Sequence, residues 1–471
     1  MTTLIIGSGL SALAVVKALS DSTDEKIYLI DANLRHQIQD KGPIGVSAKK
    51  TLFGSSHMYE ETEFTLPAVS SLSLSYAAGG LSTVWGAGIR LWDKSSVLEI
   101  TENTDNFYKS AKLLLDVVPY FGNNETMNIP LDTPITSIDA PYDENSFFDV
   151  IDGNPNLNTK IFQTPLAVRT TGFNSCVGCG LCLTGCPYGS IFSSIEYIDD
   201  CVKKEKVVRI QGKVFSLKQL IAGVEVSYKN ELNQSDIVVV DQVYMCAGAI
   251  GTPAILMQSN LLGSKIEIKD SQVFYFVGLY RRKAKNPENK FSLSRKTITD
   301  PNHFSASLYE CNSEVRARLS AVISEKLFGL RVRIPKTLDR YLFLGIGFLD
   351  SEKSGQIEMK ISDSNEIGIT TSRNSKTSVT VKQSMKIIAK YLRKSRLWVL
   401  PVFTQTPPVG AGFHSGASLP IDSQYVDELG RLRLAKSIKI ADVSLLPKIF
   451  VGSHTFNSMA LNHSLIVNKK L

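Results

Sequence analysis

The first thirty-two residues alternate between short apolar runs and one glycine-rich turn. Thr3–Ile6 is an apolar run that predicts a buried strand, and the turn Gly7–Gly9 leads into apolar positions through Ala18 that predict a helix. A second apolar run, Lys26–Ile30, predicts another buried strand. Two buried strands joined by a helix predict a parallel βαβ unit at the start of the chain.

The turn of this unit has the pattern G-x-G-x-x-A, in the residues Gly7-Ser8-Gly9-Leu10-Ser11-Ala12. Gly7 permits the tight turn, Gly9 lets the backbone approach a pyrophosphate, and Ala12 lets helix and strand pack closely. Backbone amides at the N-terminus of the helix then face the phosphates. Asp31, after the second strand, is placed to hold ribose hydroxyls. The pattern predicts a dinucleotide site, without distinguishing FAD from NAD.

Further along the chain, apolar patterning predicts a second structural region. Tyr341–Asp350 and Gln356–Thr371 contain short or alternating apolar runs that predict antiparallel strands. Ser384–Leu400 predicts a basic helix with an apolar face, for which core packing is favoured over docking to a membrane surface. Asn123–Asp143 is rich in Pro, Asn and Asp and predicts a loop.

Length and composition indicate an ordinary globular protein with room for two domains. The chain has 471 residues, 43% hydrophobic and 21% charged, with a net charge of +7. Its basic segments lack the interleaved aromatic residues that suit nucleic acid, so no nucleic-acid partner is predicted. An acidic substrate, an acidic electron partner or peripheral contact with an anionic membrane remains an alternative to solvated surface charge.

The N-terminus does not predict export. Met1–Ala18 is apolar but lacks a basic leader and is broken by Gly and Ser. No stretch reaches the ~20 apolar residues that span a bilayer. We therefore expect a cytoplasmic protein without a transmembrane segment, in a reducing compartment that suits free thiolates.

Four of the seven cysteines fall within eleven residues, in the run Cys176-Val-Gly-Cys179-Gly-Leu-Cys182-Leu-Thr-Gly-Cys186-Pro187. The spacing C-x2-C-x2-C-x3-C-P is typical of bacterial iron–sulfur ferredoxins, whose thiolates hold a cluster. It predicts Cys176, Cys179, Cys182 and Cys186 as iron ligands, in a [4Fe–4S] cluster or a three-iron form, [3Fe–4S]. A bound cluster would move electrons singly.

Two other interpretations of the cysteine run stay open, a zinc site and a pair of disulfides. Zinc prefers two separated ligand pairs, and nothing else in the chain suggests secretion. The fourth ligand is also open, because in two-cluster ferredoxins the cysteine before proline serves the other cluster. Cys186 completes a single cluster, or one of Cys201, Cys246 and Cys311 does.

Three later segments resemble the glucose–methanol–choline (GMC) oxidoreductases, a family of FAD-dependent enzymes. Residues 78–88 (AGGLSTVWGAG) resemble its second flavin-contacting loop, particularly in the pyranose-oxidase branch, and residues 243–253 (VYMCAGAIGTP) resemble its strand and turn leading to the substrate domain. The C-terminus is the best match, with residues 413–420 (FHSGASLP), 440–447 (IADVSLLP) and 452–456 (GSHTF). The resemblance covers about half the chain and is weak over residues 265–400.

This resemblance implies that the dinucleotide is FAD. Besides Gly7, Ser8, Gly9, Ser11, Ala12 and Asp31, the cofactor contacts it implies are Gly80, Ser82, Thr83, Val214, Ala247, Gly248, Asp442 and Thr455. Val214 would approach the adenine, and Asp442 with the backbone at Thr455 would approach the ribityl and pyrophosphate region. Some relatives have a histidine at the position of Val84 that bonds covalently to the flavin. Valine cannot form that bond, so the FAD is expected to be non-covalent.

Two of the six histidines stand where the family keeps its catalytic pair. Oxidation of an alcohol by hydride transfer needs a base for the hydroxyl proton, and histidine suits this role because its pKa lies near neutrality. A second polar group must hold the same oxygen. The resemblance therefore implies His414 as general base and His454 as its partner. The family's residues after the first histidine are reduced here to Gly416–Pro420, which leaves the substrate pocket unassigned.

The resemblance also implies the architecture, an α/β FAD-binding Rossmann-like domain plus an α+β substrate domain with an antiparallel sheet. The FAD domain would be discontinuous, comprising residues 1–95, 165–265 and 405–471, with the cysteine run inside it. The substrate domain would comprise residues 96–164 and 266–404.

The predicted function is oxidation of a hydroxyl on a sugar, polyol or other alcohol by an FAD-dependent dehydrogenase. Some dehydrogenases of the family have cysteines in this region and carry a cluster, so electrons are expected to leave through it to an external acceptor, a protein or a quinone. Two alternatives stay open: an oxygen-using oxidase whose cysteines are structural, and an electron-transfer flavoprotein whose alcohol site is vestigial.

Overall fold

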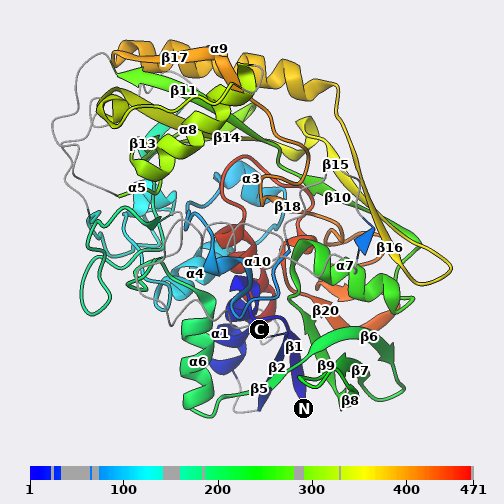
Figure 1. Cartoon of the computed structure of the whole chain (residues 1–471). Coiled ribbons are helices and arrows are strands. Elements are labelled where there is room, and N and C mark those ends of the chain that lie inside the picture. Colours follow the sequence, from blue (N-terminus) through cyan, green and yellow to red (C-terminus); the bar gives the residue numbers. More distant parts are fainter. Residues whose placement is uncertain are drawn as a thin grey trace.

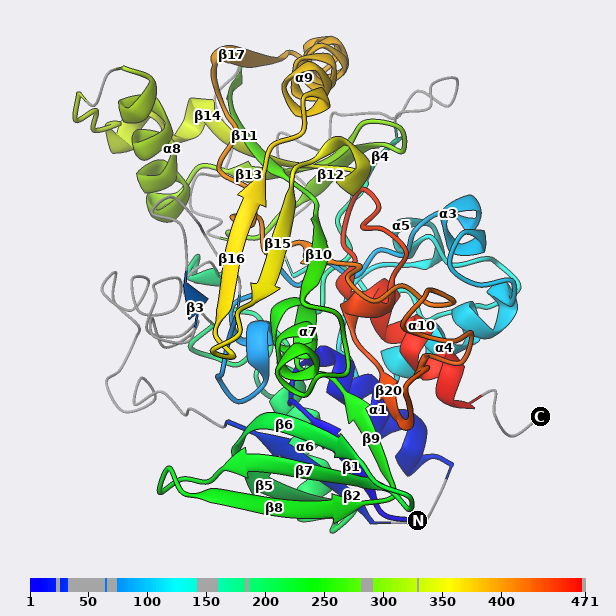
Figure 2. The same cartoon turned by 90° about the vertical axis from the view of Figure 1, so that its right-hand side faces the viewer.

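A mostly parallel six-stranded sheet forms the end of the molecule that carries the N-terminus (Figures 1 and 2). The computed structural model describes residues 1–22, 26–32, 64–65, 74–141, 160–182, 186–280, 291–327 and 330–467. The strands of this sheet are, in spatial order, β19 (Arg431–Leu432), β20 (Ala435–Ile440), β9 (Gln242–Met245), β1 (Thr3–Ile6), β2 (Ile27–Asp31) and β5 (Val207–Gln211). Only β19 runs antiparallel to its neighbour. The predicted βαβ unit is therefore confirmed.

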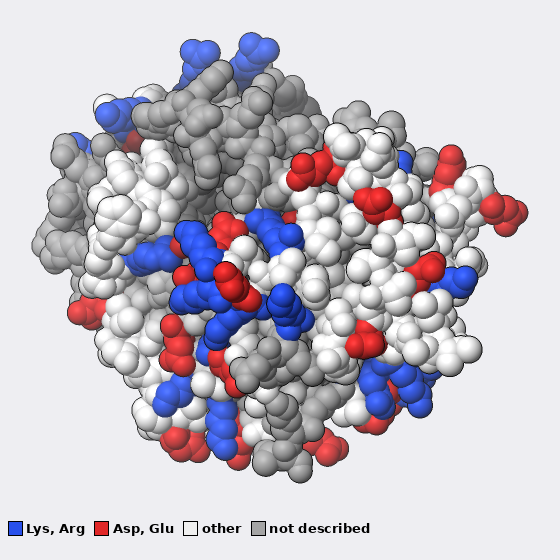
Figure 3. All heavy atoms as spheres, turned by 90° about the horizontal axis from the view of Figure 1, so that it is seen from below, with Lys and Arg blue, Asp and Glu red and all other residues white. Residues whose placement is uncertain are grey.

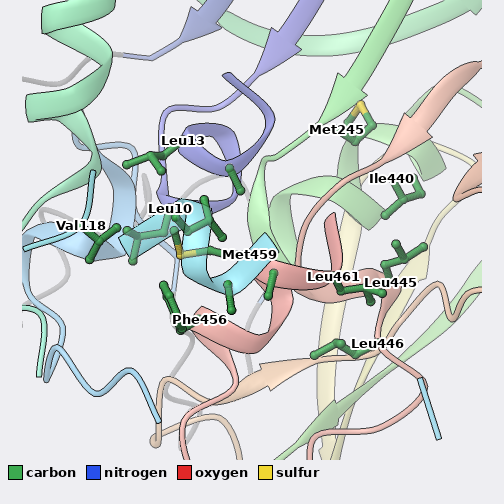
Figure 4. Packing of buried hydrophobic residues seen from close by; sticks show 14 of the residues in the cluster. Leu10, Leu13, Val118, Met245, Ile440, Leu445, Leu446, Phe456, Met459 and Leu461 are labelled. Carbon is green, nitrogen blue, oxygen red and sulfur yellow. The ribbon is translucent and has the colours of Figure 1, made fainter. Parts of the chain in front are cut away.

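Helices pack on this sheet through long apolar side chains. The described helices of this region are α1 (Leu10–Ser20), α4 (Thr104–Leu115), α6 (Ser194–Lys203), α7 (Gly248–Gln258) and α10 (Thr455–Val467). Figure 4 shows Leu10 and Leu13 of α1 close to Met459 of α10, inside the main apolar cluster. Because α10 begins directly after His454, this packing fixes one end of the segment that carries that histidine.

A second six-stranded sheet is antiparallel and lies at the far end of the molecule (Figure 2). Its strands are, in order, β17 (Leu397–Gln405), β11 (Val273–Tyr280), β14 (Leu342–Leu349), β13 (Phe304–Glu310), β12 (Lys296–Asp300) and β4 (Lys160–Gln163). Helix α8 (Ser313–Lys326) covers one face through Val315 and Leu319, and α9 (Lys376–Lys394) covers the other through Met385 and Ile388.

Glycine and phenylalanine alternate across the face of β11 and β14 that packs on α9. The register pairs Phe274 with Gly347, Phe276 with Gly345, and Phe343 with Gly278. A Cβ added at any of these three glycines would overlap the ring of its partner. Each ring therefore lies over the bare backbone of the neighbouring strand, which brings α9 close to the sheet.

Two smaller sheets complete the described structure. The five-stranded sheet contains β18 (Ser415–Gly416), β10 (Lys265–Asp270), β15 (Gln356–Ile361), β16 (Ile367–Ser372) and β3 (Phe64–Thr65), and the three-stranded sheet contains β6 (Lys213–Gln219), β7 (Val224–Lys229) and β8 (Ser235–Val240). The short helices are α3 (Lys94–Leu98) and α5 (Asn124–Met127), the latter within the predicted loop Asn123–Asp143. The strands predicted over Tyr341–Asp350 and Gln356–Thr371 are confirmed, although they belong to two different sheets.

The predicted helix Ser384–Leu400 is wrong at both ends. Helix α9 begins eight residues earlier, at Lys376. Its first turns contain Thr and Val residues of low helix propensity, so the sequence pattern did not predict a helix there. It ends at Lys394, because Arg396 adopts a left-handed conformation with φ of 59°, and the chain continues as strand β17. Among the described residues, no helix has the length and hydropathy needed to cross a membrane.

Figure 3 shows the face below the parallel sheet. Lysine and arginine side chains gather near its centre with aspartate and glutamate side chains among them. Mixed positive and negative charges of this kind are typical of solvated surface residues. A surface that attracts a polyanion would instead carry mostly positive charge.

Candidate functional site

A cavity of about 2000 Å³ extends from the N-terminus of α1 to the antiparallel sheet. It is larger than the ~300–1,000 Å³ of a pocket for one small ligand. Eleven of the fourteen residues predicted to bind the cofactor line it, namely Gly7, Ser8, Gly9, Ser11, Asp31, Gly80, Ser82, Val214, Ala247, Gly248 and Thr455. Both predicted catalytic histidines, His414 and His454, line the same cavity.

At one end of the cavity lies the glycine turn between β1 and α1. Gly7 has φ of 105°, and a Cβ there would overlap the carbonyl oxygen of Cys246 on β9's C-terminal side. A Cβ at Gly9 would meet nothing within 4 Å, so this backbone is open to the cavity. No side chain caps the N-terminus of α1. The turn thus offers uncapped amides beside open space, which suits a pyrophosphate.

Asp31, predicted to hold a ribose, is part of a buried ion pair. Its carboxylate accepts from Nη2 of Arg209 at 2.8 Å, and Arg209 also contacts Asp199 at 3.2 Å. Arg209 comes from β5, the strand that pairs with β2. Sequence reasoning missed this partner because no local pattern indicates which strand lies beside β2.

The predicted flavin loop is held in place by a buried hydroxyl network. Ser8 Oγ accepts from the amide of Gly79 at 2.9 Å, and Ser194 Oγ donates to the carbonyl of Ser8 at 2.7 Å. Ser82 Oγ donates to the carbonyl of Gly79 at 2.6 Å and lies 3.1 Å from Ser194 Oγ. Three segments far apart in sequence are thereby joined around the start of the cavity. The neighbouring Thr83 bonds inward to the carbonyl of Gly80 and does not line the cavity.

Two further predicted residues lie behind the cavity wall. Ala12 is fully buried against β1 and α6 residues, the packing role that the glycine pattern gives it. The carboxylate of Asp442 accepts from the Gly248 amide at 2.8 Å and from the hydroxyl of Thr252. Asp442 therefore fixes the N-terminus of α7, and the adjacent Gly248 reaches the cavity instead.

At the other end of the cavity the two histidines face one another. The rings of His414 and His454 are edge to face, with centroids 4.7 Å apart. The ring of Phe348, on β14, stacks on His414 at 3.9 Å and 16°. Nδ1 of each imidazole is buried and has no hydrogen-bond partner among the described residues. Phe348 was not predicted, since it lies in the region where the family resemblance is weak.

Both histidines are held in the neutral form. Burial lowers the pKa of His454 to about 4. Burial, and then the neighbouring His454, lowers the pKa of His414 well below its usual value. A neutral imidazole can accept a proton at physiological pH, and nearness to a second imidazole disfavours charge on either ring.

Asp270, at the end of β10, fixes the loop that carries His414. Its carboxylate accepts from the Ser415 hydroxyl at 2.7 Å and from the Gly410 amide at 3.0 Å. The amide of Ser271 donates to the carbonyl of His414 at 2.8 Å. Burial raises the pKa of Asp270 to about 6. These bonds hold His414 from both sides along the chain.

The two other described histidines have hydrogen-bond partners of their own. His303 contacts Asp300 through Nδ1 at 2.9 Å, and the buried His463 contacts Ser110 at 3.0 Å. His36 and His57 lie outside the described residues.

The cavity fits a dinucleotide flavin. It offers an open backbone turn at Gly9, an uncapped helix N-terminus and two unpartnered imidazole nitrogens. The residues that would hold FAD are the eleven that line the cavity. Val84 lines the cavity as well, and the non-covalent state of the FAD stays a prediction.

The described part of the cysteine run, residues 176–182 and 186, reaches the wall of this cavity at Cys182. All four cysteines are half-buried and free, and Cys182 lines the cavity itself. Gly178 and Gly180 have φ of 63° and 80°, which turn the chain back on itself. The amide of Ser190 donates to Sγ of Cys186 at 3.3 Å. The loop is anchored through Arg169, which donates to the carbonyl of Gly189 at 2.8 Å.

The thiols of the run influence one another electrostatically. Burial, opposed by hydrogen bonds from Ser292 and aided by Cys176 and Cys179, raises the pKa of Cys182 to about 11. Burial also raises the pKa of Cys176, with contributions from Cys186 and Cys179. Over the described ranges, no three His, Cys, Asp or Glu side chains are placed to hold one metal ion. A cluster differs from a single ion in that each thiolate ligates a separate iron.

Comparison with known proteins agrees with the predicted family. Residues 162–269 match the family model of GMC oxidoreductases. No curated protein matches the sequence. Among solved structures, pyridoxine 4-oxidase from Mesorbium loti has a TM-score of 0.64 and 13% identity, covering 100% of this chain and 98% of that chain. A mutated formate oxidase from Aspergillus oryzae RIB40 has a TM-score of 0.65 and 13% identity, covering 99% and 98%.

The likeness to these two structures shows the fold, in which a region with a mostly parallel sheet is combined with a region with an antiparallel sheet. The match over residues 162–269 is a likeness to the GMC oxidoreductases in that part of the chain.

Proposed function

We propose that this protein is an FAD-dependent dehydrogenase that oxidises a hydroxyl of a sugar, polyol or related alcohol. The observation that carries the proposal is the pair of neutral imidazoles, the half-buried His414 and the buried His454, in one cavity with the glycine turn at Gly9. Bound FAD supplies the acceptor for the hydride that leaves the alcohol carbon. His414 takes the hydroxyl proton, His454 holds the same oxygen, and the product is the carbonyl compound.

We further propose that Cys176, Cys179, Cys182 and Cys186 hold an iron–sulfur cluster. Such a cluster would supply one-electron transfer towards an external acceptor, a protein or a quinone. The position of Cys182 in the cavity wall supports this route, since it puts the loop beside the space that a flavin would fill. The hydrogen bond from Ser190 to Cys186 supports it too, because such bonds to sulfur tune clusters.

A second candidate function is that of an oxidase that passes electrons to oxygen. It is favoured by the two structural neighbours, both of which are described as oxidases. In that case the cysteines are structural and no iron is bound.

Anaerobic purification followed by iron, sulfide and flavin analysis separates these candidates. We expect non-covalent FAD, about four iron atoms per chain for the [4Fe–4S] form, and bleaching of the flavin by an alcohol. Absence of iron together with rapid reoxidation of the flavin by oxygen would establish the oxidase instead.

The histidine assignment has its own test. His414→Ala is expected to abolish bleaching by substrate while leaving reduction by dithionite intact. Bleaching at an unchanged rate would contradict the assigned base and favour a flavoprotein whose alcohol site is vestigial.

A further inference from the structure

The face of the antiparallel sheet that lines the cavity is divided into two chemically different halves. Side chains of alternate residues lie on the same face of a strand. On β12 and β13 the cavity-lining side chains all carry a hydroxyl, and we call them the hydroxyl half: Thr297, Thr299, Ser305, Ser307 and Tyr309. On β14 and β11 they are apolar apart from the phenol hydroxyl of Tyr275, and we call them the apolar half: Leu344, Ile346, Phe348, Val273 and Tyr275.

The strand register shows that the two halves meet along one line. Ser305 pairs with Phe348, and Ser307 pairs with Ile346. Across the hydroxyl half, Thr297 pairs with Ser307 and Thr299 with Ser305. The change from hydroxyl to hydrocarbon therefore falls between β13 and β14, and both rows of side chains cross it.

Hydroxyls of the polar half form a connected network. Thr164 Oγ1 lies 2.8 Å from Thr297 Oγ1 and 2.8 Å from Ser294 Oγ, and Thr297 Oγ1 lies 3.4 Å from Ser307 Oγ. A hydroxyl has one donor and two acceptor positions, so a chain of hydroxyls keeps unused capacity on the side that faces the cavity. This half can therefore exchange several hydrogen bonds with a ligand that carries hydroxyls of its own.

The catalytic histidines lie at the boundary between the halves. His414 stacks on Phe348, the first apolar side chain beyond the boundary. Gly452, two residues before His454, lies beside Ser305, since a Cβ there would come within 3.7 Å of its Oγ. A hydroxyl reacting between the two histidines would thus have the hydroxyl half on one side of it and the apolar half on the other.

We infer that the substrate is an amphiphilic alcohol, a hydroxyl-rich ring that carries an apolar aryl or alkyl group. This inference rests on the proposed function and narrows it. A free sugar would leave the apolar half facing polar groups, which costs the desolvation of the unpaired hydroxyls of the sugar. A purely apolar alcohol would leave the hydroxyl half without partners.

The test compares three sets of compounds with the FAD-loaded enzyme under anaerobic conditions. They are free monosaccharides and polyols, the phenyl and octyl glycosides of the same sugars, and benzyl alcohol with 1-octanol. We expect the glycosides to bleach the flavin at concentrations at least about tenfold lower than either parent set, since burial of an aryl or alkyl group provides that much affinity. Equal or better bleaching by free sugars or by simple alcohols overturns the inference.

Three variants test the two halves separately. Thr297→Val keeps the shape but removes a hydroxyl, and we expect a roughly five- to tenfold higher half-saturating concentration for glycosides with little change for benzyl alcohol. Ile346→Thr introduces a hydroxyl into the apolar half and should reduce the preference for glycosides over free sugars. Thr371→Val, on an exposed strand of another sheet, is the control. If both cavity variants keep the wild-type preference for glycosides over free sugars and unfold at the wild-type temperature, the division of the sheet face into two halves does not determine substrate preference.

Binding measured without turnover separates this inference from the proposed function. In His414→Ala, perturbation of the flavin spectrum reports binding alone. If His414→Ala binds glycosides preferentially but glycosides do not bleach the flavin of the wild-type protein, the proposed dehydrogenase activity is wrong and the proposed ligand class is supported. Bleaching without that preference, or no binding by any glycoside, would refute the ligand class.

Discussion

The imidazole of His414 is clamped between two rings, with Phe348 stacked on its face at 3.9 Å and His454 edge-on at 4.7 Å. This arrangement holds the orientation of the ring and shields both of its sides from water. Removal of water lowers the pKa, and the ring therefore remains a base far below neutral pH.

The first prediction concerns the pH dependence of flavin reduction. The base acts in its neutral form, and the pKa values of both histidines are lowered, that of His454 to about 4. The rate of anaerobic flavin reduction by substrate should therefore stay constant as the pH falls through 6.5, the usual pKa of histidine, and decline only as the pH approaches the lowered values. Stopped-flow measurements between about pH 4.5 and 8.5 check this, and an inflection near 6.5 would refute it.

The second prediction is a matched pair of glycine substitutions in the turn before α1. Gly7→Ala should lower the stability of the apoprotein, because φ is 105° and the methyl group would overlap the Cys246 carbonyl. Gly9→Ala should leave the stability of the apoprotein within about 0.5 kcal/mol, since nothing lies within 4 Å of its methyl group.

FAD titration distinguishes the two variants. Gly9→Ala should weaken FAD binding by at least about tenfold, because the methyl group enters the space where the pyrophosphate approaches the backbone. Thermal unfolding of the apoproteins supplies the control. Normal FAD affinity in Gly9→Ala would mean that the dinucleotide does not lie against this turn.

The third prediction concerns the cysteine run. Cys182→Ser should remove most of the iron and sulfide while FAD content and bleaching by substrate remain, and transfer to an external one-electron acceptor should slow. Cys311→Ser is the matched control, since Cys311 is half-buried and lies outside the run beside Asp339; loss of iron in this variant would instead make Cys311 the fourth ligand. Iron, sulfide and flavin analysis checks this; full iron content in both variants would place the cluster elsewhere.

The fourth prediction tests Asp270 as a positioning residue for His414. Asp270→Asn can still accept from Gly410 and can donate to Ser415, so flavin reduction should change by less than about threefold. Asp270→Ala removes both bonds and leaves buried groups unpaired, which costs about 1–3 kcal/mol for each group.

The pH dependence of the free energy of unfolding tests whether the carboxyl group of Asp270 is protonated in the folded protein. The pKa of Asp270 is raised to about 6, so the folded protein binds a proton more tightly than the unfolded chain between about pH 4 and 6. Its contribution to stability is therefore present at low pH and is lost as the pH rises through 6. Asp270→Asn should abolish this pH-dependent contribution to stability. Thermal unfolding of the wild-type protein and the variant from pH 4.5 to 7.5 measures the difference. An unchanged profile in Asp270→Asn would show that the carboxyl stays ionised throughout.

The parts of the site that the sequence predicted are those governed by local sterics or by a family pattern. Gly7 and Gly9 follow from the geometry of one turn, and the strands on either side of it are short apolar runs. The histidine pair was found through the family resemblance, because nothing local relates His414 to His454, forty residues apart.

The parts that were missed depend on contacts between distant segments. Arg209 meets Asp31 only because β5 lies beside β2, and Phe348 meets His414 only because β14 ends at the cavity. The early start of α9 was missed since its first turns are rich in Thr and Val, and packing of that helix on the sheet outweighs their weak propensity.

The paired glycines and phenylalanines on the α9 side of the antiparallel sheet have a consequence for how the enzyme can change. Glycine at 278, 345 or 347 admits no substitute while its partner ring is present. The opposite face of the same strands bears Val273 and Ile346 against the cavity, beside Phe348, which stacks on His414. Replacement of cavity-facing residues of β11 and β14 can therefore alter substrate preference. The glycines and phenylalanines on the α9 side of these strands, which do not contact substrate, preserve the backbone geometry.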